Sequence, residues 1–319
     1  MDNILITSRE FGRQLGDAHW QALEHELASR GCRIIVHTVR KPMRAGDILR
    51  VNRKHPLHAI LVYSSLDQVN AAVIRGCTRL KVISRHGVGV DNIDVETATR
   101  AGIPVCTTAS ARAHESVADF TFALLLTLVR RVAATDRAMR AGARFRPISP
   151  DVWGKTLGIV GLGRIGKAVA RRASGFSMSV LTYSPRLLPE TAATYGAQRV
   201  PLKTLLQQSD IVTLHASLNP GSRGMIGRQE LALMKPGAFL INTARAGLVN
   251  QPALLAALTS GSLGGAAVDV FDQEPAFNDP LITAGLEHLV ATSHIASYTT
   301  DSLRRMDLTT VRNILDSLA

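Results

Sequence analysis

Three polar residues in the last third of the chain, Arg245, Glu274 and His294, each come shortly after an apolar run. If these runs are parallel strands, their carboxyl ends form the ligand crevice of an open α/β sheet, and the three side chains meet there. An imidazole with a pKa near about 6.5 gives and retakes a proton around neutral pH, and a neighbouring carboxylate holds the ring in one tautomer. A guanidinium polarises a carbonyl group and holds an anion. This combination suits the proton transfer that accompanies hydride addition to a ketone.

A glycine-rich turn precedes these residues. Gly161, Gly163 and Gly166 form a GxGxxG pattern between an apolar run at 157–160 and a helical pattern that begins at Lys167. The first glycine permits a tight turn, the second lets the backbone approach a pyrophosphate, and the third lets the helix pack closely on the strand. The turn predicts a dinucleotide site, with an ordinary strand-to-helix turn as the alternative.

The residues after the next predicted strand bear on which dinucleotide binds. A site that prefers NAD carries a carboxylate there for the ribose 2′-hydroxyl, whereas this chain has Ser184 and Arg186. A serine hydroxyl and a guanidinium can both donate to a 2′-phosphate. We therefore predict NADP(H) as the preferred cofactor, with NAD(H) possible and a solvated loop arginine as the alternative interpretation.

The strands and helices that must position these residues are predicted to alternate along the chain, as they do in parallel α/β folds. In the first part we predict strands over 3–7, 32–38, 59–62 and 80–84, helices over 14–30 and 68–75, and a long apolar helix over 115–132. The alternation restarts after two prolines at 147 and 150. There we predict strands over 157–160, 179–183, 211–215, 238–242, 265–270 and 289–292, and helices over 165–173, 202–208 and 252–258.

Composition limits the function classes. At 319 residues the chain is long enough for two domains, and its 46% hydrophobic residues can fill their cores. Lys and Arg number 37 against 25 Asp and Glu, so the net charge is +12. That charge suits a small anionic substrate, and because the basic residues are scattered we predict no nucleic-acid partner.

Other patterns bear on compartment and metals. The three cysteines, Cys32, Cys77 and Cys106, fit neither a disulfide framework nor a zinc site. The start of the chain lacks a signal-peptide pattern, and the apolar run near 120–129 is shorter than the about 20 residues that span a bilayer. We expect a cytoplasmic protein with no membrane partner. No metal site is predicted, because the histidines at 86, 114 and 215 lack ligand spacing.

The motifs together resemble the D-isomer-specific 2-hydroxyacid dehydrogenases, a family that includes glyoxylate/hydroxypyruvate reductases and phosphoglycerate dehydrogenases. The resemblance is carried by residues 86–94 (HGVGVDNID), 161–166, 242–247 (NTARAG), 269–275 (DVFDQEP) and 293–296 (SHIA). It implies an α/β protein with two doubly wound parallel-sheet domains, in which a Rossmann dinucleotide-binding domain (103–289) is inserted into a flavodoxin-like substrate domain (1–102 and 290–319). It also implies a homodimer with the helix over 115–132 at the contact.

The resemblance further implies a role for each matching residue. Arg245 matches the substrate-binding arginine, Glu274 the carboxylate paired with the catalytic histidine, and His294 the acid/base. Val88 and Gly89 match the loop whose N–H groups hold the substrate carboxylate. On the cofactor side the matching residues are Gly161, Gly163, Arg164, Ile165, Gly166, Ser184, Arg186, Thr243 beside the nicotinamide ribose, and Asp269 facing the nicotinamide amide. From the residues alone, Asp269 could instead cap a helix and Thr243 could be a turn residue.

The expected substrate is a small anionic 2-oxo or 2-hydroxy acid. Tyr63 stands where phosphoglycerate dehydrogenases place a phosphate-binding arginine, and no regulatory domain follows Ala319, so we expect a glyoxylate/hydroxypyruvate reductase-like enzyme before a phosphoglycerate dehydrogenase-like one. Arg85 could still meet a second anionic group on the substrate. A dinucleotide-sensing corepressor is the alternative from another class. The net charge favours it, whereas the retained Arg245, Glu274 and His294 favour an enzyme.

Overall fold

A five-stranded parallel sheet is formed by β1 (Asp2–Ile6), β2 (Cys32–Val36), β3 (Ala59–Val62), β4 (Val82–Arg85) and β5 (Val105–Thr107) in a computed structural model that describes residues 1–319. Its strand order is β2-β1-β3-β4-β5. All four residues of β3 are buried, as is typical of a parallel strand covered on both faces. The order reverses between β1 and β3, as in flavodoxin-like folds.

A second parallel sheet has seven strands. They are β6 (Thr156–Val160), β7 (Ser179–Tyr183), β8 (Ala197–Arg199), β9 (Ile211–Leu214), β10 (Ala238–Asn242), β11 (Leu263–Val268) and β12 (Leu289–Ala291), in the order β12-β11-β10-β9-β6-β7-β8. The order reverses between β6 and β9, the switch point of a Rossmann sheet. The predicted fold class, α/β with two doubly wound parallel sheets, is confirmed.

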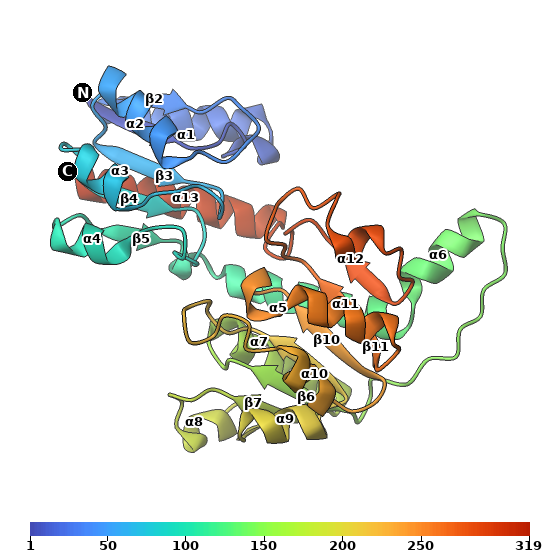
Figure 1. Cartoon of the computed structure of the whole chain (residues 1–319). Helices are drawn as coiled ribbons and strands as arrows, with labels where there is room; N and C mark the ends of the chain where they lie inside the picture. Colours follow the sequence, from blue (N-terminus) through green and yellow to red (C-terminus); the bar gives the residue numbers. More distant parts are fainter. The chain divides into compact units, whose positions relative to one another are not determined.

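Helices lie beside the strands of each sheet (Figure 1). With the first sheet lie α1 (Asp17–Ser29), α2 (Ala45–Lys54), α3 (Ala71–Gly76), α4 (Val95–Arg100) and α13 (Thr300–Leu318). With the second lie α5 (Ala113–Val129), α6 (Val132–Arg140), α7 (Arg164–Ala173), α8 (Pro189–Ala193), α9 (Leu202–Gln208), α10 (Arg228–Leu233), α11 (Gln251–Thr259) and α12 (Pro280–Thr283). No helix of the chain combines the length and the apolar composition that crossing a membrane requires.

The chain divides into two compact units. Unit 1 comprises 1–113 and 298–319, and unit 2 comprises 114–297. Both crossings lie later in the chain than the predicted boundaries after 102 and 289. The second difference has a simple cause, because β12 pairs with β11 and so belongs to the second sheet. The loop that carries His294 is therefore part of unit 2.

Several elements differ from the predicted ones. The helix expected over 115–132 is α5, which begins at Ala113 and ends at Val129, and the separate helix α6 begins at Val132. Between them Arg131 has a left-handed φ of 51°, which interrupts helical geometry. The C-terminal helix α13 was not predicted at all. Its buried side includes Thr310 and Asp307 beside Val311 and Ile314, so its pattern lacks a plain apolar stripe.

Candidate active site

The carboxyl ends of three neighbouring strands in unit 2 carry the predicted catalytic residues. Arg245 follows β10, Glu274 lies in the loop after β11, and His294 follows β12. These strands are adjacent and parallel, so the residues that follow them leave the same edge of the sheet. Such an edge is where open α/β sheets bind ligands.

Glu274 and His294 are in direct contact. The Nδ1 atom of His294 lies 3.0 Å from Oε1 and 3.1 Å from Oε2 of Glu274. Oε1 also accepts a hydrogen bond of 3.3 Å from the backbone N–H of Phe271, which ties the carboxylate to its own loop. A carboxylate at Nδ1 keeps the proton on that nitrogen and leaves Nε2 to exchange a proton with a ligand. The His294 side chain is one-third exposed, so the ring is accessible.

The turn that leads to Arg245 is held by hydrogen bonds of the Asn242 side chain, which the sequence did not reveal. The side chain of Asn242, at the end of β10, donates to the carbonyl of Arg245 at 2.9 Å and accepts from the N–H of Ala244 at 3.1 Å. The guanidinium donates through Nη1 to the Ala244 carbonyl at 2.8 Å. The sequence feature that could have identified Asn242 is a polar residue at the end of an otherwise apolar strand. Its side-chain amide fixes the turn that ends at Arg245.

Asp269 and Thr243, both predicted to contact the cofactor, are buried. The carboxylate of Asp269 is fully enclosed and accepts hydrogen bonds from the segment 292–296. The hydroxyl of Thr243 lies 3.3 Å from that of Thr121 on α5. Neither contact tests the predicted cofactor roles. Asp269 caps no helix, since its partners lie in a loop that ends before α13.

The glycine-rich turn has the geometry that a dinucleotide needs. Gly161 has a φ of 97°, and a Cβ there would lie 2.7 Å from the backbone nitrogen of Ala216. A Cβ on Gly166 would lie 2.2 Å from the carbonyl oxygen of Gly161. At Gly163, by contrast, a Cβ would meet nothing within 4 Å. The backbone of Gly163, which precedes α7, thus borders open space where N–H groups at the helix start can meet a pyrophosphate.

The predicted NADP determinants lie after β7. Ser184 is half-buried and Arg186 is exposed. A second guanidinium reaches the same loop, because Arg199 on β8 donates to the carbonyl of Pro185 at 3.1 Å. Arg199 was not identified from the sequence, since it comes well after this loop and only the pairing of β7 with β8 brings it close. Arg164 opens α7 with an exposed side chain, followed by the half-buried Ile165.

One buried histidine can be excluded as an acid or base. His215, directly after β9, is enclosed, and burial lowers its pKa to about 3. Its Nε2 lies 3.0 Å from the hydroxyl of Thr213. The ring is therefore neutral throughout the physiological pH range.

The predicted carboxylate-binding loop lies in unit 1, after β4. Val88 is about half exposed, and Gly89 is partly buried. The guanidinium of the buried Arg85 donates to the carbonyls of Gly89 at 3.1 Å, Val62 at 3.0 Å and Tyr63. Arg85 therefore clamps this loop to the end of β3, and this use of its donors argues against the expected contact with a second anionic group of the substrate.

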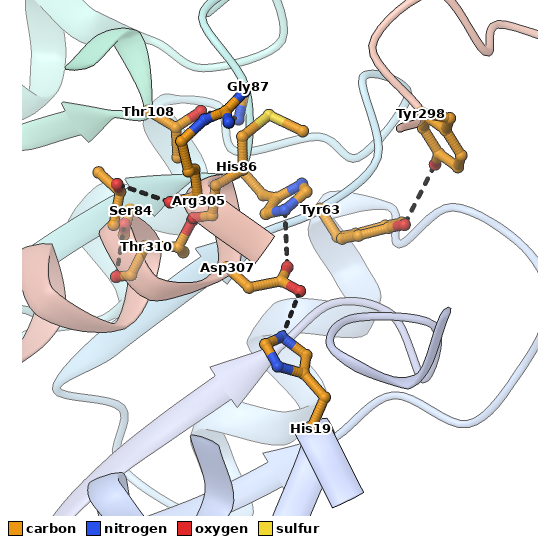
Figure 2. A network of polar contacts seen from close by, with 12 residues as sticks. His19, Tyr63, Ser84, His86, Gly87, Thr108, Tyr298, Arg305, Asp307 and Thr310 are labelled. Atoms are coloured by element: carbon orange, nitrogen blue, oxygen red, sulfur yellow. Dashed lines mark hydrogen bonds and ion pairs between the residues drawn. The ribbon is translucent and has the colours of Figure 1, made fainter. Parts of the chain in front are cut away.

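A polar network lies beside that loop in unit 1 (Figure 2). Asp307 of α13 lies between two histidines, with Oδ1 2.9 Å from Nε2 of His86 and Oδ2 3.0 Å from Nε2 of His19. The ring of Tyr63 stacks on that of His86, with 5.0 Å between centroids, and its hydroxyl lies 3.1 Å from the hydroxyl of Tyr298. His86 is thus held as a structural residue that joins the end of β4 to α13.

The chain is similar to characterised families and proteins. The family model described as "D-isomer specific 2-hydroxyacid dehydrogenase, NAD binding domain" matches residues 122–296. A glyoxylate reductase of Thermococcus litoralis is 40% identical over 264 residues, which are 80% of this chain and 79% of that protein. A D-3-phosphoglycerate dehydrogenase of Methanocaldococcus jannaschii is 40% identical over 248 residues, 76% of this chain but only 46% of that protein. The crystal structure of a D-lactate dehydrogenase from Aquifex aeolicus, complexed with NAD and lactic acid, superposes with a TM-score of 0.81 at 28% identity and covers 98% of this chain and 93% of that one.

The space at Gly163 generates a prediction. Gly163→Ala should leave the unfolding midpoint unchanged but weaken NADPH binding about tenfold, because the added methyl group enters the space assigned to the pyrophosphate. Thermal unfolding and a fluorescence titration with NADPH measure the two quantities. Gly175→Ala is the control, since its Cβ also meets nothing within 4 Å and it lies beyond the end of α7. Equal NADPH affinity in the two variants would contradict the placement.

Proposed function

The chain belongs to the D-isomer-specific 2-hydroxyacid dehydrogenase family, and we propose that it reduces C2 of a small 2-oxo acid with NADP(H), in the manner of a glyoxylate/hydroxypyruvate reductase. It is an NAD(P)-dependent oxidoreductase. The observation that carries the specific proposal is the contact of Glu274 with Nδ1 of His294 at the carboxyl edge of the dinucleotide-type sheet. Bound NADPH supplies the hydride for C2.

In the proposed reaction, side chains of this protein transfer the proton to the oxygen at C2 and bind the negatively charged carboxylate of the substrate. His294 donates a proton from Nε2 to the oxygen at C2 during reduction and retakes it in the reverse direction. Glu274 holds the ring in the tautomer that carries a proton on Nδ1, because its carboxylate accepts at that nitrogen. Arg245 polarises the C2 carbonyl and binds the substrate carboxylate. We also propose that the N–H groups of Val88 and Gly89, in unit 1, bind a carboxylate.

The identity of the residue at position 63 favours a short substrate. Tyr63 is buried, its ring is stacked on His86, and it offers no positive charge to a phosphate group. Arg85 could supply one, but its guanidinium binds three backbone carbonyls. We therefore propose glyoxylate or hydroxypyruvate before a phosphorylated hydroxy acid, although a phosphoglycerate dehydrogenase is among the similar proteins.

The cofactor preference rests on three side chains. Ser184 and Arg186 follow β7, and Arg199 reaches the same loop. Two guanidinium groups and a hydroxyl, with no carboxylate in the segment 184–188, suit a ribose 2′-phosphate better than a free hydroxyl. We propose that NADP(H) is preferred over NAD(H).

An exposed apolar surface supports a homodimer. Most apolar side chains of α5 are buried within unit 2, so this helix offers less for a dimer contact than its sequence suggested. The helix α6 has no buried residue and exposes Met139 at 67%, and the segment after it exposes Trp153 at 72% and Ile148 completely. Large exposed apolar side chains are typical of an interaction site. We propose that a second copy of the chain covers this segment, and that the protein is cytoplasmic.

The catalytic role of His294 gives the first test. His294→Ala should lower kcat for glyoxylate or hydroxypyruvate reduction by about 10² or more and leave NADPH affinity nearly unchanged, since general acid catalysis is lost while the cofactor contacts remain. NADPH oxidation and a binding titration measure the two effects. His25→Ala removes an exposed histidine of α1 and should retain full activity. A fully active His294→Ala enzyme would contradict the proposal, and a wild-type chain that binds NADPH but reduces no 2-oxo acid would favour the corepressor alternative.

The cofactor proposal gives the second test. Arg186→Ala should raise KM for NADPH about tenfold while the KM for NADH stays constant, because only NADPH carries the phosphate that the guanidinium meets. Arg228→Ala, which removes an exposed charge from α10, is the control. If the ratio of the two KM values is the same in wild type and the Arg186 variant, the assigned role is incorrect.

The dimer proposal gives the third test. The double variant Ile148→Asp, Trp153→Asp should sediment as a monomer while wild type sediments as a dimer, because two charges would be buried in the contact. Leu188→Asp introduces a charge at another exposed apolar position, 67% accessible, and should leave the dimer intact. A monomeric wild type, or a double variant that remains dimeric, would refute this surface.

A further inference from the structure

Asp269 is a fully buried carboxylate that makes three hydrogen bonds to one short segment. It follows β11, and its side chain has no accessible surface. Its Oδ1 accepts from the hydroxyl of Thr292 at 2.6 Å and from the N–H of Ile295 at 2.9 Å, and its Oδ2 accepts from the N–H of Ala296 at 2.9 Å. A buried carboxylate without hydrogen bonds destabilises the folded protein, so these three bonds are needed to keep Asp269 in this position.

The three donors enclose His294 on both sides along the chain. Thr292 precedes it by two residues, and Ile295 and Ala296 follow it directly. His294 itself has a φ of 58°, in the left-handed region that only a small share of residues other than glycine occupy. A backbone of this kind persists only where its surroundings hold it. The bonds to Asp269 act on the residues directly beside this strained position.

Two carboxylates of the same loop thus hold the histidine in different ways. Glu274 contacts the imidazole ring at Nδ1. Asp269 holds the backbone from which that ring projects, and the N–H of Asp269 is itself fixed by the carbonyl of Asn242 at 3.0 Å. The direction of the ring depends on the backbone as well as on the ring contact, because a small rotation at His294 would carry the imidazole away from Glu274.

We propose that Asp269 is the positioning residue of His294, acting through the segment 292–296 rather than through contact with substrate. The proposal rests on the acid/base role assigned to His294 above, and it differs from the predicted role of Asp269 at the nicotinamide amide. The two roles predict different kinetic results. A residue that holds the histidine affects kcat, whereas a residue that binds the nicotinamide affects dinucleotide affinity.

The experiment uses Asp269→Asn in the full chain. The amide has nearly the size of the carboxylate but turns an N–H₂ group toward one set of backbone N–H donors, so the segment should loosen. We expect kcat to fall about 10²-fold, the Kd for NADPH to change less than twofold, and amide hydrogen exchange at Ile295 and Ala296 to accelerate at least tenfold. Thr292→Val keeps the carboxylate and removes one donor, and it should show smaller changes of the same kind.

The outcomes separate the possible roles. A tenfold or greater rise in the NADPH Kd with an unchanged kcat would overturn the proposal in favour of direct cofactor binding. Unchanged exchange at Ile295 and Ala296 would overturn it as well. If Asp269→Asn does not fold, the same three quantities are measured on Thr292→Val, and the same results would overturn the proposal. A wild-type chain without 2-oxo acid reductase activity would refute the proposed function. The exchange measurement needs no substrate, so it would still show whether Asp269 holds the segment 292–296.

Discussion

The contact between the carboxylate of Glu274 and Nδ1 of His294 is the interaction on which the functional account depends. It occupies Nδ1 and so leaves Nε2 as the nitrogen that is available to a ligand. Without it, His294 would be a partly exposed histidine in a loop. With it, the loops after β11 and β12 hold one carboxylate–imidazole pair, the acid/base unit that in the proposed function protonates the ketone oxygen of the substrate.

The sheet explains why this unit can be built from distant residues. Parallel strands β10, β11 and β12 end at the same edge, so Arg245, Glu274 and His294 leave it together although they are far apart in sequence. The backbone hydrogen bonds between these strands hold the three strand ends in place, and hydrogen bonds from buried side chains hold the loops that follow them. Asn242 fixes the turn at Arg245, and the buried carboxylate after β11 fixes the segment around His294. Side chains at a catalytic edge are useful only when such supports hold them.

Much of the fold could be predicted from the sequence for a physical reason. Strands at 59–62, 179–183 and 238–242 were predicted with the residues that the structure shows, because parallel strands buried on both faces appear as short, mainly apolar runs. Helices with a polar or mixed buried side, such as α13, give no comparable signal. The separation of α5 from α6 at Arg131 depends on one left-handed residue, which composition does not reveal.

The same distinction applies to the site. Motif spacing identified the glycine turn and the residues of the acid/base unit, since their chemistry requires particular residue types. It did not identify Asn242 or Arg199, whose positions follow from a turn brace and from the pairing of β7 with β8. Arg85 was predicted as a possible anion contact because its charge is visible in the sequence, whereas its three carbonyl partners are visible only in the fold.

The central claim is that this chain moves a hydride between NADP(H) and C2 of a 2-oxo acid. Its most direct test is incubation of the wild-type protein with hydroxypyruvate and NADPH deuterated at C4 of the nicotinamide, followed by mass spectrometry and chiral analysis of the product. The account predicts glycerate of D configuration with deuterium at C2. Absence of labelled product, with NADPH binding intact and with glyoxylate and other short 2-oxo acids equally unreactive, would contradict it.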